Sequence, residues 1–127
     1  MATYVQTNQP ITLTNANYVV SVVDTGKIFL LIDITGDRTI TLPAPVAGLH
    51  YIFINLALAA VHNWTVECGA GTVNGVLVRV GVAVATAVAA GGHINFIGGT
   101  SIVGDCVEVY CNGLTWSVGL SVEPEQV

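Results

Sequence analysis

The sequence predicts an all-β domain, an antiparallel sandwich or barrel-like fold of about nine short strands. Short runs rich in Val, Ile, Thr and Tyr recur along the chain, and Gly, Asn, Asp or Pro separate them. The 127 residues suit one domain with a core of its own. No segment has a convincing helical period. The alanine-rich residues 80–90 alternate Val with Ala at period two, which favours a strand or extended ribbon.

The candidate strands follow from these runs and from the turn residues between them. In chain order they are residues 18–23, 28–34, 39–42, 51–56, 64–68, 76–84, 93–97, 106–111 and 114–122. We therefore expect a β domain over residues 18–122. Residues 1–17 are polar and rich in Thr and Asn, and residues 123–127 are acidic with a proline, so both ends are predicted to be arms or tails.

The strand over residues 51–56 is predicted to be central. Tyr51, Phe53 and Asn55 point to one side of it, and Ile52 and Ile54 point to the other. Because both sides are largely apolar, we expect this strand to be buried on both faces.

The segment from Asp105 to Leu120 predicts a β-hairpin. Asn112-Gly113 is a strong signal for a two-residue type I′ turn. That turn would set Cys111 opposite Leu114 and Val109 opposite Trp116. One face of the hairpin would then be apolar and the other mostly polar, in agreement with the strand pattern. The apolar face would hold Val107, Val109, Cys111, Leu114, Trp116, Val118 and Leu120.

The cysteines are interpreted as packing residues. Cys106 and Cys111 are five positions apart on one strand, so they point to opposite faces and cannot share a metal ion or a disulfide. Cys111 is expected to be a small buried hydrophobe. A total of three cysteines does not suit a secreted disulfide framework, and the spacing matches no zinc motif. We expect free thiols, although a pair between Cys68 and Cys106 is not ruled out by spacing.

The composition predicts an oligomer. The chain is 53% hydrophobic and only 9% charged, against roughly 25% charged residues in typical domains. A monomer of this composition would expose a large apolar surface, and contact with copies of itself would bury that surface. The small side chains of the ribbon would allow close approach of two sheets, so the predicted interface comprises Val80, Val82, Val84, Thr86 and Val88.

The charges exclude several partners. The net charge is −5, and Lys27, Arg38 and Arg79 are the only permanent cations. Three scattered cations cannot form the basic patch that nucleic acid or an anionic membrane surface requires. The apolar residues 80–90 fall short of the roughly 18 needed to span a bilayer. The N-terminus lacks the basic and apolar regions of a signal peptide.

No catalytic, cofactor or metal site is expected. His50, His62 and His93 are far apart in sequence and form no local metal-binding pair. Asp33 and Asp37 flank a glycine turn, but they lack the dense oxygen ligands of a calcium loop. No serine lies in a nucleophile motif, and the glycine-rich residues 69–75 contain no lysine. The sequence therefore predicts a protein that is not an enzyme.

Two stretches resemble β-rich virion proteins of phages and other viruses, namely tail-fibre, spike and capsid-decoration domains. They are ITLPAPVAGLHYIFINLA (residues 40–57) and GDCVEVYCNGLTWSVGL (residues 104–120), roughly a quarter of the chain. The pattern is one of strands and turns, and the cysteines at 106 and 111 depart from it. The matching positions are Thr41, Leu42, Pro43, Gly48, Tyr51, Phe53, Asn55, Gly104, Asp105, Val107, Gly113, Trp116 and Val118.

The resemblance implies a structural role in a virion, commonly as a homotrimer, with capsid or other virion proteins as partners. The chain has no long fibre segment, so we expect a small decoration or cement protein, assembled in the host cytoplasm. The alternative is a module that binds a glycan or cell-surface receptor through exposed aromatic residues. Its main candidate residues are Trp64, His62 and Asn63, with Tyr51 and Tyr110 as further aromatics. Exposure of these aromatics distinguishes the two hypotheses.

Overall fold

The computed structural model describes residues 9–57, 61–68, 73–77, 86–88, 93–96, 101 and 103–122. This part of the chain is β-rich, as predicted, with one turn of 3₁₀ helix, η1 (Val22–Asp24). It contains no helix long and apolar enough to cross a membrane. The strands are β1 (Ile11–Thr12), β2 (Tyr18–Val19), β3 (Ile28–Leu31), β4 (Arg38–Thr41), β5 (His50–Asn55), β6 (Trp64–Glu67), β7 (Val73–Leu77), β8 (Thr86–Val88), β9 (Ile94–Phe96), β10 (Cys106–Cys111) and β11 (Trp116–Val122).

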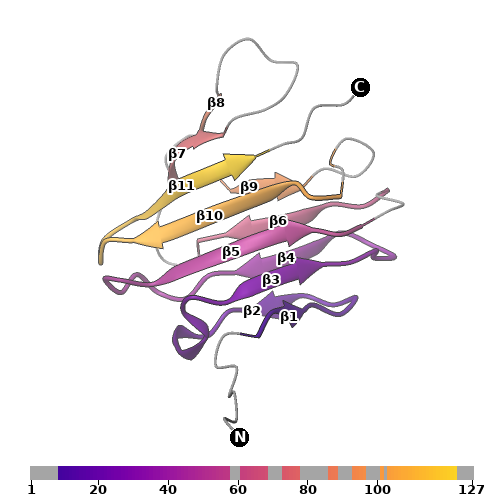
Figure 1. Ribbon diagram of the computed structural model, residues 1–127, viewed down its shortest axis with the longest axis horizontal. Helices are drawn as coiled ribbons and strands as arrows, with labels where there is room; N and C mark the ends of the chain where they lie inside the picture. Colours follow the sequence, from indigo (N-terminus) through magenta and orange to yellow (C-terminus); the bar gives the residue numbers. More distant parts are fainter. Residues whose placement is uncertain are drawn as a thin grey trace, which may run out of the picture.

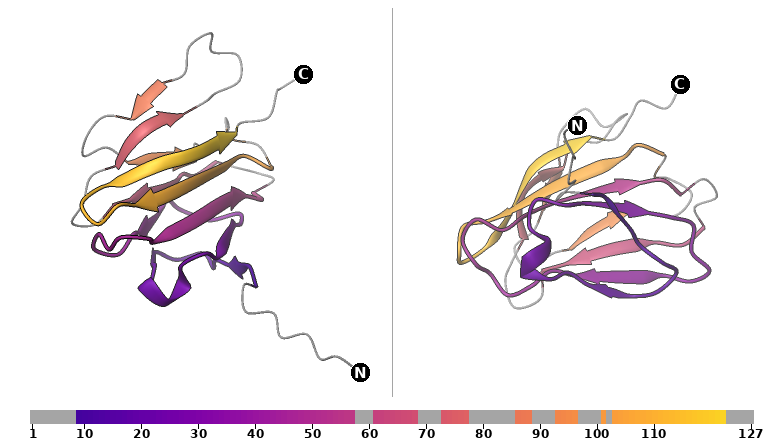
Figure 2. Two further views of the ribbon diagram at one scale, coloured as in Figure 1. Left: turned by 60° about the vertical axis from the view of Figure 1, so that its left-hand side comes forward. Right: turned by 60° about the horizontal axis from the view of Figure 1, so that its bottom comes forward.

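The strands form two sheets that lie face to face as a sandwich (Figure 1). The large sheet has seven strands in the order β1-β3-β5-β10-β11-β7-β8. The small sheet has four strands in the order β2-β4-β6-β9. Figure 2 shows the two layers from other sides, with the N-terminal strands at one end of the molecule.

The first six strands wind as a solenoid, which the sequence did not predict. They alternate between the sheets, and their neighbours in each sheet are parallel: β1-β3-β5 in the large sheet and β2-β4-β6 in the small sheet. The expectation of purely antiparallel sheets is therefore wrong for this half. Consecutive strands belong to opposite sheets, so each connection passes from one sheet to the other and the two strands that it joins do not pair as a hairpin.

The rest of the chain closes the sandwich mainly with antiparallel pairs. β10 pairs with β5 and β11 with β10, while β9 pairs with β6. β7 joins the far side of the large sheet parallel to β11, and β8 follows it antiparallel at the edge. Both sheets are thus mixed.

The core lies between the two sheets. The ring of Phe29 on β3 stacks on that of Phe53 on β5, with centroids 5.3 Å apart, because parallel pairing places the two residues side by side. Tyr51 and Trp116 extend this aromatic layer of the large sheet. The small sheet contributes Ile40, Trp64, Val66, Ile94 and Phe96.

The central position of β5 is confirmed. It lies between β3 and β10, and Tyr51, Phe53 and Asn55 are buried against the other sheet. Its other side, with Ile52 and Ile54, is only half-buried, so the predicted burial on both faces is incomplete within one chain.

Part of the predicted N-terminal arm belongs to the domain. Ile11 and Thr12 form β1, which pairs in parallel with β3. Leu13 is buried in the core. Residues 1–8, like the predicted tail at 123–127, lie outside the described residues.

The hairpin of β10 and β11 exists, but its predicted register is wrong. Cys111 pairs with Trp116 and Val109 with Val118, so four residues, 112–115, connect the strands. Gly113 has a positive φ of 98°, whereas Asn112 does not, and a type I′ turn requires it at both positions. The Asn112 side chain instead accepts hydrogen bonds from the backbone N–H groups of Leu114 and Thr115, at 2.9 Å each.

The change of register moves one predicted apolar residue to the surface. Leu114 is 80% exposed, whereas Val107, Val109, Cys111 and Trp116 are buried as predicted. The pairing also shifts between Val107 and Val109, where β11 carries an extra residue, which is a β-bulge.

Candidate interaction face

The outer faces of the two sheets differ in chemistry. The outer face of the small sheet is mostly polar. Its outward side chains are Thr39, Thr41, Thr65, Glu67 and Asn95, and the apolar Val19 is exposed at its edge. The outer face of the large sheet is apolar over β3, β5 and β10, where half-buried side chains alternate with core residues. These side chains are Ile28, Leu30, Ile52, Ile54 and Cys106.

Strand pairing makes this apolar area continuous. Ile28 lies beside Ile52, and Leu30 lies beside Ile54 on the adjacent parallel strand. Cys106 on β10 continues the second row from Ile54. We call this block, together with the His50, Glu108 and Tyr110 side chains described next, the outer face of the large sheet. No described segment crosses it in Figure 1.

Three polar side chains lie together on the same face. His50 on β5 pairs across the ladder with Tyr110 on β10, and their rings stack with centroids 4.6 Å apart and an interplanar angle of 9°. The Tyr110 hydroxyl donates a hydrogen bond to Oε1 of Glu108. Nε2 of His50 lies 3.5 Å from the same carboxylate oxygen. The one carboxylate of this cluster thus accepts a hydrogen bond from a hydroxyl group and has an imidazole nitrogen beside it.

A glycine keeps this part of the face flat. A Cβ atom on Gly119 of β11 would lie 2.1 Å from Cε2 of Tyr110. The tyrosine ring therefore lies over the backbone of the neighbouring strand, and any larger residue at 119 would push it away from the sheet. The ring remains 45% exposed on its outer side.

The residues proposed for glycan binding do not form an exposed aromatic site. Trp64 is 1% exposed, and its indole N–H donates to the carbonyl of Ile32 at 2.9 Å, so it is a core residue. Tyr51 is fully buried as well. Of the aromatics considered from the sequence, Tyr110 is the exposed one, and its neighbours are His50 and Glu108.

His62 and Asn63 lie near Trp64 but outside the core. The carboxylate of Asp37 accepts a hydrogen bond from the backbone N–H of Asn63, and Nδ1 of His62 lies 3.6 Å from it. Together these contacts tie the Gly36-Asp37 turn to the start of β6.

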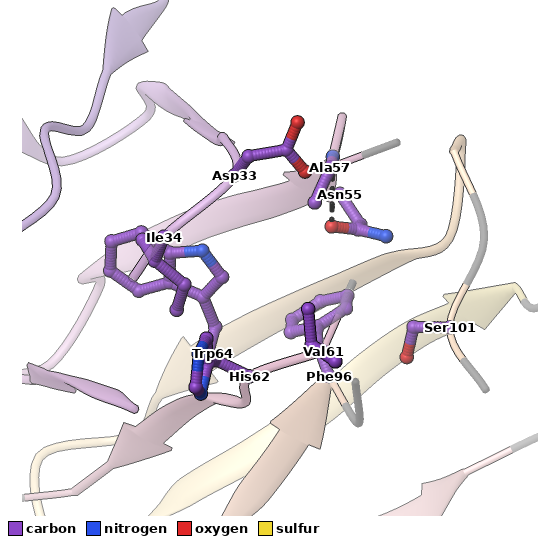
Figure 3. Close-up of a pocket in the computed structure, with 9 residues that line it drawn as sticks. All are labelled: Asp33, Ile34, Asn55, Ala57, Val61, His62, Trp64, Phe96 and Ser101. Carbon is purple, nitrogen blue, oxygen red and sulfur yellow. Dashed lines mark hydrogen bonds between the residues drawn. The ribbon is translucent and has the colours of Figure 1, made fainter. Parts of the chain in front are cut away.

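A small pocket lies beside this region (Figure 3). Its volume of about 10 Å³ is close to the space that one water molecule requires, which excludes a sugar ring. Its lining comes from the ends of several strands: Asp33, Ile34, Asn55, Ala57, Val61, His62, Trp64, Phe96 and Ser101.

The predicted self-association segment is described only in part. Val80, Val82 and Val84 lie outside the described residues. Thr86 and Val88 belong to β8, which pairs with β7 and ends the large sheet. The backbone of Thr86–Val88 is therefore extended and lies at a sheet edge.

The described residues contain no group of three or more His, Cys, Asp or Glu side chains placed to hold a metal ion. His50 faces outward on β5, whereas His62 contacts the turn at Asp37. No disulfide joins the three cysteines, all of which the structure describes; Cys68 and Cys111 are buried, while Cys106 is half-buried on the outer face.

Sequence reasoning missed the outer face as a site. The signal was present in residues 50–54 and 106–110, where polar or apolar residues alternate with core residues. The sequence did not reveal that β3 pairs in parallel with β5. This pairing places Ile28 and Leu30 beside Ile52 and Ile54 and so widens the apolar block.

The chain has no significant match among protein-family models, curated proteins or solved structures.

Proposed function

We propose that the protein is a non-enzymatic structural protein of a virion, a decoration or cement protein that works as a homo-oligomer on a capsid. The observation that carries this proposal is the difference between the two outer faces of the sandwich. One is polar and suited to water, and the other is apolar, flat and suited to contact with protein.

Further support comes from the fold and the composition. A sandwich with only 9% charged residues has few side chains that could act as acids, bases or nucleophiles, and 53% hydrophobic residues that can pack against other protein surfaces. The sequence pattern at residues 40–57 and 104–120 resembles virion β domains and is the basis for naming a capsid as the partner and a trimer as the expected assembly.

Virions purified from cells that carry this sequence test the proposal. We expect the protein in those particles at many copies, detected by mass spectrometry, and density for it on the capsid surface in electron cryomicroscopy. Particles made without it should release their genome at a lower temperature. Its absence from purified particles, with unchanged particle stability, would contradict the proposal.

A receptor- or glycan-binding module is the second candidate, and one observation favours it. Tyr110 is an exposed aromatic ring beside a carboxylate and an imidazole, a combination that suits a sugar face and its hydroxyl groups. A glycan array tests this candidate. Binding that disappears in Tyr110→Ala would support it, and the absence of any bound glycan would remove it.

A further inference from the structure

We infer that the outer face of the large sheet is covered by another copy of this chain. The inference rests on the self-assembly part of the proposed function and names its surface. Self-association through this surface could occur without a virion, so binding to particles and self-association are tested in separate experiments.

The first argument is the apolar block. Ile28, Leu30, Ile52 and Ile54 form two adjacent rows on a sheet face, and in the single chain they shield one another only in part. Water in contact with such a surface costs about 25 cal/mol for each Å² of apolar area, so association gains free energy. The polar outer face of the small sheet offers no comparable gain.

The second argument is that the carboxylate on this face already has a partner. Among the described side chains of this face, Glu108 has the one carboxylate, whose Oε1 accepts a hydrogen bond from the Tyr110 hydroxyl and lies 3.5 Å from Nε2 of His50. A second copy would bring the same matched group. Covering the face therefore leaves no carboxylate without a partner, which would otherwise oppose burial. A partner with a strongly basic or acidic surface would find no complementary charge here.

The third argument is the place of the apolar block in such a contact. β3, β5 and β10 lie about 4.8 Å apart, and β5 and β10 have six residues each, so the block measures roughly 15 by 20 Å, or about 300 Å² before side-chain relief is added. A stable interface buries roughly 800 Å² per partner, so a second copy would cover the block as the apolar centre of the contact and extend beyond it. The flat Tyr110 ring over Gly119 removes an obstacle to close contact between two such faces.

The test compares two variants that place the same charge on opposite outer faces. Ile52→Lys adds a lysine to the centre of the apolar block, and Thr41→Lys adds one to the polar face of the small sheet. Molar mass is measured by light scattering and sedimentation over a range of concentrations. We expect the wild type and Thr41→Lys to be oligomers, and Ile52→Lys to have the 13.2 kDa mass of one chain. Its dissociation constant should rise at least about a hundred-fold, because the lysine would be buried without a partner.

A second measurement on the unmodified protein covers the case in which Ile52→Lys does not fold. Cys106 lies on the proposed interface, whereas Cys68 and Cys111 are buried in the core. The reaction of Cys106 with a maleimide should be slow at high protein concentration and become faster on dilution.

Three results would overturn the inference: a wild-type mass of one chain at all concentrations, an unchanged oligomer in folded Ile52→Lys, or Cys106 labelling that does not depend on concentration. An unchanged oligomer in Ile52→Lys would remove this surface but leave self-association and particle binding intact. Absence from virions together with the expected masses would remove the virion role alone.

Discussion

The two tryptophans show how similar burial can conceal different energetics. Trp64 and Trp116 are 1% and 0% exposed, and both belong to the core between the sheets. The indole N–H of Trp64 donates to the carbonyl of Ile32, whereas that of Trp116 has no hydrogen-bond acceptor within the described structure. Burying an N–H without a partner costs free energy, so Trp116 contributes by packing alone.

This difference predicts unequal effects of the same substitution. Trp64→Phe and Trp116→Phe remove similar volume, but only Trp64→Phe breaks a hydrogen bond and leaves a carbonyl without its donor. We expect Trp64→Phe to lower the free energy of unfolding by about 1–2 kcal/mol more than Trp116→Phe. Urea denaturation of both variants measures the difference. Equal losses would show that the bond to Ile32 contributes nothing.

Tyr51 makes stability depend on pH in the alkaline range. Burial, and then the negative charge of Asp24, raise the pKa of Tyr51 from 10.0 to about 12. The folded state therefore holds the phenolic proton more tightly than the unfolded state does. Its contribution is fully present below pH 10 and is lost as the pH rises from 10 to 12, by no more than about 2–3 kcal/mol.

Tyr51→Phe tests this dependence. The variant loses the hydrogen bond from the Tyr51 hydroxyl to the carbonyl of Ser21, so we expect it to be about 1 kcal/mol less stable at neutral pH. Between pH 10 and 12 its stability should fall less than that of the wild type. Burial also raises the pKa of Tyr18, which leaves a smaller dependence of the same sign. Parallel curves of urea midpoint against pH would contradict the role of Tyr51.

At the scale of the elements, the loop between β10 and β11 depends on one side chain. The carboxamide oxygen of Asn112 accepts two hydrogen bonds from backbone N–H groups of the loop, in addition to the backbone bond from the Asn112 N–H to the carbonyl of Thr115. Asn112→Ala should therefore cost about 1 kcal/mol, whereas Asn112→Asp keeps the acceptor and should cost less than half of that. Thermal unfolding of the two variants provides the comparison. A loss in Asn112→Asp as large as in Asn112→Ala would mean that the acceptor is not what holds the loop.

The individual strands could largely be predicted from the sequence, but their pairing could not. Periodicity identified β5 and β10 and the inward side of each, since alternation of two depends only on local residues. The solenoid was missed because its coils are unequal. Ile11 pairs with Phe29 and Phe29 with Phe53, which gives steps of 18 and then 24 residues and leaves no fixed period to detect.

The outer face of the large sheet could not be predicted from the sequence for a related reason. Trp64 was considered as a ligand-binding residue because His62 and Asn63 precede it, but the fold turns its ring inward and bonds its N–H to Ile32. The outer face of the large sheet joins residues from β3, β5 and β10 that are up to about 80 positions apart. Only knowledge of the pairing brings them together.

At the scale of the whole molecule, self-association should appear in the unfolding temperature. A partner that binds only the folded state stabilises it in proportion to the logarithm of its concentration. We expect the Tm of the wild type and Thr41→Lys to rise by several degrees over a hundred-fold increase in protein concentration. The Tm of Ile52→Lys should stay constant. A wild-type Tm independent of concentration would speak against assembly.

The order of strands in the large sheet has a consequence for synthesis on the ribosome. β5 is complete at Asn55, but its neighbour on one side, β10, begins only at Cys106. While the intervening residues are translated, β5 keeps an unpaired edge and Tyr51 lacks the neighbouring Trp116 ring, so both are open to other nascent chains. The hairpin of β10 and β11 closes that gap only after residues 56–105 have been made, so strands synthesised late decide whether the earlier strands become a finished domain or an aggregate.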